Sequence, residues 1–206
     1  MIEQLFKLLN TLINYRQKVL CKFWYWHSLY ILKRHNAVHK DLFLRGRIFF
    51  FISNNSKVII GKYFFCNSGP HYCINSSEYT KIRVGDNAQL IIGDNVGISS
   101  SAISCYNKIV IGNGVNIGSG SIIMDTNFHS TNPFLRGGRK ETIADIVTRP
   151  ITIENNVFIG AHSIILKGVR IGENSIIAAG SVVTKDVPKN QIWGGNPAVF
   201  IKEIIY

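Results

Sequence analysis

The 206-residue sequence lacks several features that would place it in a familiar class. No apolar run approaches the roughly 18 residues of a membrane span, because Lys22 and His27 interrupt the best candidate. There is no apolar region followed by a cleavage site of signal-peptide type. The four cysteines have neither zinc-ligand spacing nor a dense disulfide pattern. We therefore expect a cytoplasmic protein with reduced thiols.

Acidic residues are also scarce, at 12 against 23 Lys and Arg, and the excess of positive charge is uneven. Residues 1–50 hold nine Lys or Arg against Glu3 and Asp41, a net charge of +7. No nucleic-acid recognition motif accompanies this charge, so we expect no nucleic-acid partner.

The basic N-terminal region also carries apolar residues at helical spacing, followed by an aromatic cluster; these are Leu5, Leu8, Leu9, Leu12, Ile13, Phe23, Trp24, Tyr25 and Trp26. Two interpretations stay open. The helix caps the first layer of the fold and packs against a neighbouring subunit, or it rests peripherally on the anionic inner face of a membrane. We assign residues 1–55 to this basic, amphipathic capping segment.

The strongest pattern is a six-residue repeat in the C-terminal half. Aliphatic residues recur every six positions without a miss, at Ile153, Ile159, Ile165, Ile171, Ile177 and Val183. Four positions after each comes a small or branched residue: Val157, Ser163, Val169, Ser175, Ser181 and Val187. An α-helix would place residues six apart on different faces, and a β-sandwich would show a period of two.

A strict short period of this kind is typical of a solenoid, and the hexapeptide repeat predicts a parallel β-helix. Three hexads form a triangular coil of about 18 residues, and coils stack at roughly 4.8 Å. The pattern extends upstream through Ile123, Ile117, Ile111, Ile98 and Ile92, and less regularly to Val84 and Ile60. Ile98 and Ile111 lie thirteen residues apart, so one corner between them must bulge.

These repeats define an all-β solenoid over residues 56–197, followed by a C-terminal tail or short helix over 198–206. One insertion, residues 124–150, interrupts the array and predicts a projecting, functional loop. His129 stands near its start. Asp125, four residues earlier, either accepts a hydrogen bond from the imidazole and orients it or serves as a turn residue.

Three segments bring these features together: Asp125–Ser130, the restart Arg149–Ala161 and the close Ala179–Pro188, completed by Gly195-Asn196-Pro197-Ala198. Together they resemble the hexapeptide-repeat acyltransferases, particularly the galactoside, maltose and Nod-factor O-acetyltransferases and those that modify surface polysaccharides. The resemblance covers residues 84–203. It implies a left-handed β-helix, a homotrimer with active sites between subunits, and acetyl-CoA lying in the groove between two β-helices.

The resemblance also implies roles for individual residues. His129 matches the general base, and the N–H of Ala161, after Gly160, matches the oxyanion donor. Contacts to the pantetheine arm and the nucleotide fall on Ala179, Thr184 and Lys185. Two arginines that contact the CoA phosphates in galactoside acetyltransferases are replaced by Val199 and Lys202, so only Lys202 can bind phosphate.

The acceptor site differs from that of the galactoside enzymes. Their acidic sugar-binding residue corresponds to a position near Cys105 or Tyr106, neither of which is acidic, and this argues against a galactoside. Ser99 and Ser100 lie nearby and offer hydroxyls to a sugar, or they mark a tight corner.

The sequence thus favours an acetyl-CoA-dependent O-acetyltransferase of a sugar or glycan in bacterial surface polysaccharide synthesis, with direct transfer and no metal. The alternatives are N-acetylation of an amino sugar nucleotide, a non-catalytic scaffold, and a zinc-dependent carbonic anhydrase of the same fold. The last needs three converging histidines, whereas His71, His129 and His162 are widely separated in the sequence.

Overall fold

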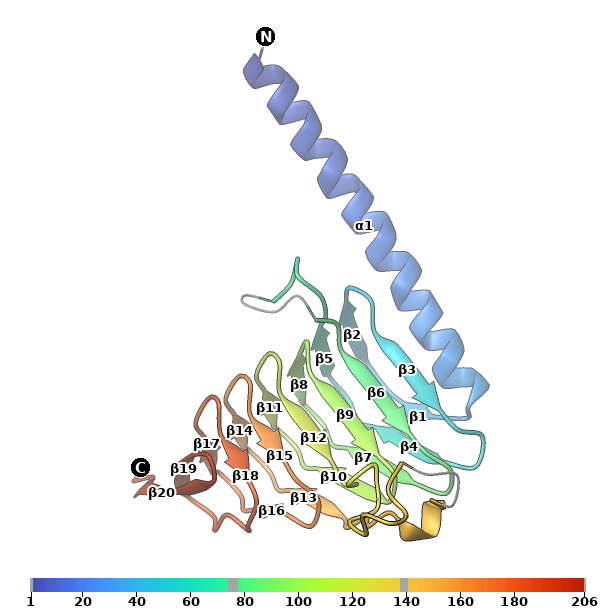
Figure 1. Ribbon diagram of the computed structural model, residues 1–206. Coiled ribbons are helices and arrows are strands. Elements are labelled where there is room, and N and C mark those ends of the chain that lie inside the picture. The colour runs from blue at the N-terminus through green and yellow to red at the C-terminus, as the bar shows by residue number, and fades with distance from the viewer. Residues whose placement is uncertain (1, 74–77, 138–140, 206) are drawn as a thin grey trace.

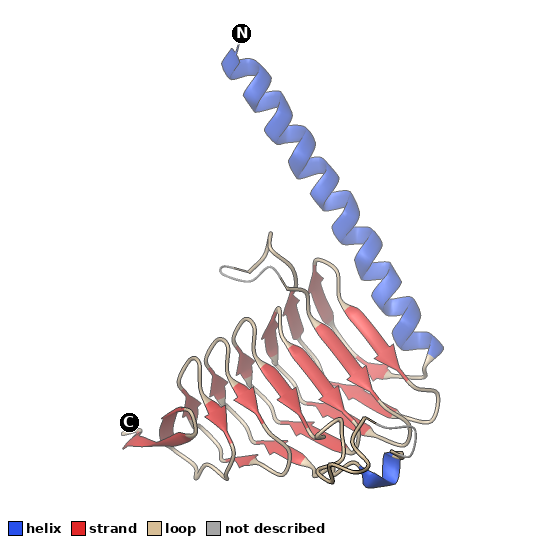
Figure 2. Ribbon diagram, viewed as in Figure 1, coloured by secondary structure: helices blue, strands red, loops and turns tan. Residues whose placement is uncertain are grey.

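The structure is a computed structural model that describes residues 2–73, 78–137 and 141–205. Its body is a three-walled prism of stacked coils, and a long helix extends from one end (Figures 1 and 2). That helix is α1 (Ile2–Arg34). A short 3₁₀ turn, η1 (Ile143–Asp145), lies in the inserted loop.

Each wall is one sheet that takes every third strand of the body, and neighbouring coils pair in parallel. Sheet A contains β1 (Val38–His39), β4 (Lys57–Ile60), β7 (Gln89–Ile92), β10 (Lys108–Ile111), β13 (Ile151–Ile153) and β16 (Arg170–Ile171). Sheet B contains β2 (Leu42–Arg45), β5 (Phe64–Asn67), β8 (Gly97–Ser99), β11 (Asn116–Ile117), β14 (Phe158–Ile159), β17 (Ile176–Ile177), β19 (Gln191–Gly195) and β20 (Ala198–Glu203). Sheet C contains β3 (Phe49–Ile52), β6 (Lys81–Val84), β9 (Ala102–Cys105), β12 (Ile122–Met124), β15 (Ile164–Ile165) and β18 (Val182–Val183).

The core consists of the two residue columns that the hexad predicts. All six aliphatic residues from Ile153 to Val183 are fully buried, as are the serines and valines four positions later. The register stacks like on like, with Ile117 paired to Ile159 and Ile123 to Ile165. Buried serine hydroxyls are satisfied at the corners, since Ser121 donates to Gly160 O and Ser163 to Ala178 O. The predicted β-helix is confirmed.

The solenoid begins earlier than the predicted boundary at residue 55. Its first coil is formed by β1, β2 and β3, which pair with β4, β5 and β6. Phenylalanines at positions 49–51 replace the regular hexad there, so the periodicity gave no sign of this coil. Within the described part of the predicted capping segment, α1 is the element that lies outside the prism.

The cap is the second half of α1, which contacts β1, β2 and β3. Leu32 is fully buried, and Tyr25 and Leu29 pack against the core. The first half extends beyond the body (Figure 1). At the other end, the predicted tail is strand β20, which turns back antiparallel to β19 and closes sheet B.

The irregular spacing between Ile98 and Ile111 comes from two corners, not one. Ile98 and Ile103 are five residues apart, whereas their partners Ile117 and Ile123 are six apart. The next corner is wider, because Cys105 adds a second inward residue to β9.

The inward column should dominate the stability of the prism. Replacing Ile165, which is fully buried, with Ala should reduce the free energy of unfolding by about 2–5 kcal/mol. Its neighbour Ile164 points outward and is only half-buried, so Ile164→Ala is the matched control with a clearly smaller loss. Chemical denaturation measures both, and equal losses would contradict the assigned core.

Candidate active site

The chain turns between sheets at three edges, and the candidate residues lie on two of them. We call the corners from sheet B to sheet C the B–C edge, and those from sheet C to sheet A the C–A edge. The loop over residues 125–150 leaves the C–A edge between β12 and β13. An antiparallel bridge between Thr126 and Thr148 closes its base.

His129 lies near the start of this loop, and a carboxylate holds its ring. The imidazole Nδ1 is 3.1 Å from Oε2 of Glu141, and the His129 side chain is 60% exposed. Glu141 also accepts hydrogen bonds from the backbone N–H groups of Ser130 and Gly137. The sequence analysis did not find Glu141, because it lies twelve positions after His129 in the loop and no periodicity links the two.

These contacts fix the charge of Glu141. The Ser130 amide, the His129 ring and the Gly137 amide together lower its pKa to about 2, so it is ionised at any assay pH near neutrality. A carboxylate at Nδ1 favours the tautomer with the proton on that nitrogen. Nε2 then keeps its lone pair and can accept a proton from a substrate.

Asp125 has a different role from the orienting one considered above. Its fully buried carboxylate accepts hydrogen bonds from the backbone N–H groups of Tyr106 and Asn107, at 2.7 and 2.8 Å. Burial raises its pKa, and these backbone hydrogen bonds oppose the shift. The imidazole instead pairs with Glu141, so Asp125 anchors the base of the loop to the preceding corner.

Two buried cysteines, Cys66 and Cys105, are not nucleophiles. Burial raises the pKa of Cys66 to about 12. Burial and the adjacent Asp125 do the same for Cys105. Both stay protonated at neutral pH and lack the thiolate that covalent catalysis requires.

The B–C edge presents a row of open backbone donors. Corners Gly118–Ser121, Gly160–Ser163 and Ala178–Ser181 stack on one another, with His162 N donating to Ser119 O and Gly180 N to Ala161 O. Among the described residues, no acceptor pairs with the N–H of Ala161 or of Ala179. A Cβ at Gly118 would lie 2.5 Å from Ala161 N, and one at Gly160 would lie 2.5 Å from Ala179 N. The glycines therefore keep both amides accessible.

This geometry fits the acyl donor expected from the sequence. Among the described residues, the Ala161 and Ala179 N–H groups are unpaired hydrogen-bond donors at successive corners of the same edge, where the resemblance implies the oxyanion donor and a pantetheine contact. Thr184 and Lys185 lie on the C–A edge instead, at the corner after β18, and both are exposed. Lys202 is exposed on β20, and Val199 lies on the same strand.

The three residues expected at the acceptor site lie in different environments. Ser99 is half-buried and lines a hollow on sheet B between Phe65 and Phe158. Ser100 is buried, and its hydroxyl accepts a hydrogen bond from Gly69 N, so it is unavailable to a sugar. Tyr106 lies across the C–A edge, 5.6 Å from the Phe128 ring, in a cavity beneath the loop.

The two halves of the site lie on different edges of one chain. Sheet C separates the Ala161 corner from the C–A edge, because strand β15 lies between the two in the same coil. The described part of the 125–150 loop packs over earlier corners of its own edge, against Gly85, Asp86 and Tyr106, and it also borders Phe51 and Arg83 of sheet C.

The described residues contain no group of three His, Cys, Asp or Glu side chains placed to hold a metal ion. Over the same part of the chain, no helix has the length and apolar character needed to cross a bilayer.

Comparisons with known proteins agree with this architecture. Residues 150–185 match the family model described as hexapeptide repeat of succinyl-transferase. Galactoside O-acetyltransferase from Escherichia coli (strain K12) is 31% identical over 82% of this chain and 71% of that protein. The enzyme of the same name from Lactococcus lactis is 41% identical over 47% of this chain and 44% of that protein.

Solved structures show the same fold. An N-acyltransferase from Bacillus cereus, in complex with dTDP-4-amino-4,6-dideoxyglucose and coenzyme A, superimposes with a TM-score of 0.65 at 19% identity, covering 82% of this chain and 84% of that one. A hexapeptide-repeat acetyltransferase from Vibrio cholerae gives 0.53 at 24% identity, covering 87% and 81%.

The fold and the two edges define a β-helical acyltransferase. The chain belongs to the hexapeptide-repeat acetyltransferases, enzymes that use acetyl-CoA. The scaffold and carbonic anhydrase alternatives are set aside by this membership.

Two substitutions separate the roles of Glu141 and Asp125. Glu141→Gln removes the charge that holds the imidazole tautomer, and kcat should fall about 10–100-fold, as for other partners that orient a histidine. Asp125→Ala leaves two backbone donors unpaired, and the free energy of unfolding should fall by about 2–4 kcal/mol. Steady-state kinetics and denaturation together distinguish them. A folded Asp125→Ala protein with a larger kcat loss than Glu141→Gln would contradict this assignment.

Proposed function

We propose that this enzyme transfers the acetyl group of acetyl-CoA to a hydroxyl of a sugar or glycan, as a step in bacterial surface polysaccharide synthesis. The observation that carries the proposal is the pairing of His129 with ionised Glu141 on one edge, matched by the open Ala161 amide on another. A sugar hydroxyl is protonated at neutral pH, so its attack on a thioester needs a general base.

His129, Glu141 and Ala161 each take a separate part in the proposed reaction. Nε2 of His129 takes the hydroxyl proton as the sugar oxygen attacks the thioester carbonyl, while Glu141 stabilises the imidazolium that forms. The Ala161 N–H donates a hydrogen bond to the developing oxyanion. The C–S bond then breaks, and the imidazolium returns its proton to the departing sulfur. Direct transfer fits a site whose buried thiols stay protonated.

The donor would lie along the B–C edge, with Gly160 and Ala179 beside the pantetheine arm. Thr184, Lys185 and Lys202 would reach its nucleotide from a neighbouring surface. On the acceptor side, Ser99 and Tyr106 remain the proposed sugar contacts, while buried Ser100 is withdrawn from this role.

We propose a homotrimer as the active form. Because His129 and Ala161 lie on different edges, one protomer must place its loop against the B–C edge of the next to complete a site. A cyclic arrangement of three chains provides three such contacts. We place the enzyme in the cytoplasm, with α1 at the inner face of the membrane where lipid-linked glycans are assembled.

Release of free CoA thiol, measured over a panel of sugars and glycans, tests the chemistry. His129→Ala should lower kcat on the order of 10²–10⁴-fold, the usual cost of removing a general base. The product should be an ester that mild alkali hydrolyses. An alkali-stable amide would instead establish N-acetylation of an amino sugar, and an unchanged rate in the variant would remove His129 from the mechanism.

Subunit mixing tests the shared site. Gly118→Ala places a Cβ against Ala161 N and should inactivate the donor side, while His129→Ala inactivates the base. When both variants are refolded together in equal amounts, about a quarter of the interfaces combine intact halves, so activity should return to about a quarter of wild type. Each variant alone should stay inactive as a folded trimer. No recovery in the mixture would place both halves in one chain.

A further inference from the structure

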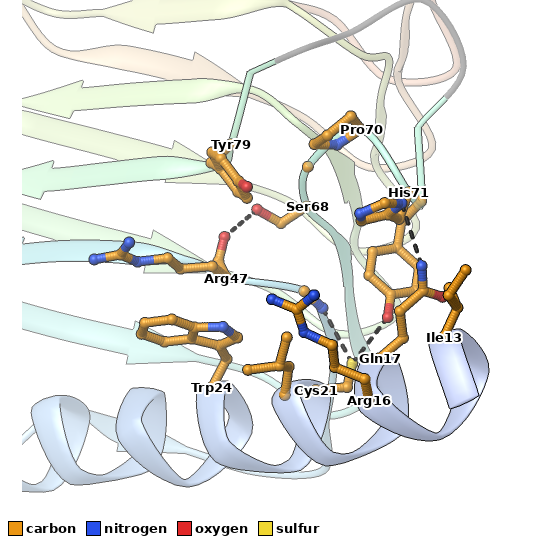
Figure 3. Close-up of a pocket in the computed structure, with 14 residues that line it drawn as sticks. Ile13, Arg16, Gln17, Cys21, Trp24, Arg47, Ser68, Pro70, His71 and Tyr79 are labelled. Carbon is orange, nitrogen blue, oxygen red and sulfur yellow. Dashed lines mark hydrogen bonds between the residues drawn. The ribbon is translucent and has the colours of Figure 1, made fainter. Parts of the chain in front are cut away.

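A second cavity, of about 340 Å³, lies between α1 and the loop that joins β5 to β6. In Figure 3, Arg16 and Trp24 rise from the helix into the cavity, and Ser68, Pro70 and His71 lie across from them on the loop side. Two contacts brace the loop against the helix: Tyr72 Oη lies 3.4 Å from Cys21 Sγ, and His71 Nδ1 lies 3.4 Å from Gln17 Nε2. The sequence analysis passed over this loop, which the catalytic machinery described above does not use.

Two cationic side chains line the cavity, Arg16 and Arg47, and none of the described lining residues is Asp or Glu. The Arg47 guanidinium lies between two rings, 4.3 Å from the centre of Trp24 and 4.2 Å from that of Phe49. Stacking holds the faces of the guanidinium and leaves its edge N–H donors for a ligand. Such donors match the oxygens of a phosphate group.

An apolar stripe on α1 borders this cavity. Apolar residues exposed along one side of the helix are Leu9, Leu12, Val19, Phe23, Trp26 and Tyr30, between 49 and 67% exposed. They lie three or four positions apart, except Leu12 and Val19, which are seven apart. At 100° per residue they lie opposite the side that packs on the prism, where Cys21, Ser28 and Leu32 are covered. Ile13 and Leu20 are exposed as well and also line the cavity, so stripe and cavity are continuous.

The net charge of α1 indicates which kind of partner covers the stripe. α1 holds six Lys or Arg against Glu3, a net charge of +5, and Arg16 interrupts the stripe at its centre. Copies of α1 packed stripe to stripe would repel one another. An anionic bilayer complements this charge and accepts Phe, Trp and Tyr at its interface.

The cavity also lies on the edge that carries the donor amides. Ser68 and Gly46 begin B–C corners, three and four coils from Ala161. At about 4.8 Å per coil, a group bound near Ser68 lies about 14 Å along the edge from Ala161. A phosphate held there leaves room for a few sugar units between a lipid and the point of acyl transfer.

We propose that this cavity binds the phosphate group of a membrane lipid while the outer stripe of α1 lies on the bilayer. The site would hold the enzyme beside acceptors linked to lipid through phosphate. Only this role of the site, holding the enzyme beside its acceptors, rests on the proposed function. Binding of the lipid phosphate is measured without acetyl-CoA or acceptor. Its failure would therefore leave the acetyltransferase proposal intact.

Co-sedimentation of the full chain with vesicles is the test. Phosphatidylcholine vesicles that contain phosphatidylglycerol should bind the protein, and vesicles of phosphatidylcholine alone should bind it far less. Lys22→Gln, which removes an α1 charge outside the cavity, should weaken binding about fivefold, the effect of one charge near an anionic surface. Arg16→Gln and Arg47→Gln should each weaken it more than tenfold, and a double variant, Leu12→Gln with Val19→Gln, should abolish it.

Three outcomes would overturn the proposal. Equal losses of vesicle binding in Arg16→Gln and Lys22→Gln would show that the cavity contributes only general positive charge and no specific phosphate site. Calorimetric binding of inorganic phosphate that depends on Arg16, with vesicle binding unchanged in Arg16→Gln, would make the ligand a soluble phosphate. Absence of vesicle binding, with dissociation of the oligomer in the stripe variant, would show that another copy of the chain covers the stripe.

Discussion

The structure depends on inward-pointing aliphatic residues that stack on the equivalent residues of the neighbouring coils. Each aliphatic residue of the hexad meets the same kind of residue in the coil above and below, so every coil has nearly the same cross-section. The three edges are therefore continuous lines of corners, and a backbone group at one corner is repeated at fixed spacing along its edge. Small inward residues such as Ser163 and Ser181 satisfy their hydroxyls at these corners without widening the coil.

The candidate catalytic groups lie at two edges of the prism. The B–C edge aligns the Ala161 and Ala179 amides, and glycines one coil away keep them open. The C–A edge carries the inserted loop, whose base Asp125 fastens to an earlier corner and whose histidine Glu141 orients. Because these groups lie on different edges of one prism, they meet between chains in the proposed trimer. At its N-terminal end, the B–C edge also reaches the basic cavity beside α1.

The sequence was sufficient for the parts of the fold that repeat. Buried columns, parallel stacking and the position of the inserted loop follow from hexad spacing, because identical packing environments demand identical residue types. The sequence was insufficient for segments whose packing does not repeat from coil to coil. The phenylalanine-rich first coil has no hexad, and the β5–β6 loop interrupts a region whose register was already irregular.

The same limit applies to the site. His129 and Ala161 could be placed from motifs, whereas the partner of His129 could not. Glu141 is far along a loop without period, and its role depends on how the loop folds back onto Ser130 and Gly137. Asp125 was the nearer acid in sequence, but burial and two backbone donors commit its carboxylate elsewhere. Ser100 likewise resembled an exposed hydroxyl and is buried against Gly69.

The central claim is that each active site joins the C–A edge of one chain to the B–C edge of another. A crystal structure of the enzyme bound to coenzyme A tests it most directly. We predict the sulfur beside the Ala161 N–H of one protomer and within reach of His129 from its neighbour. A sulfur bound beside His129 and Ala161 of the same protomer, or far from both, would contradict the account.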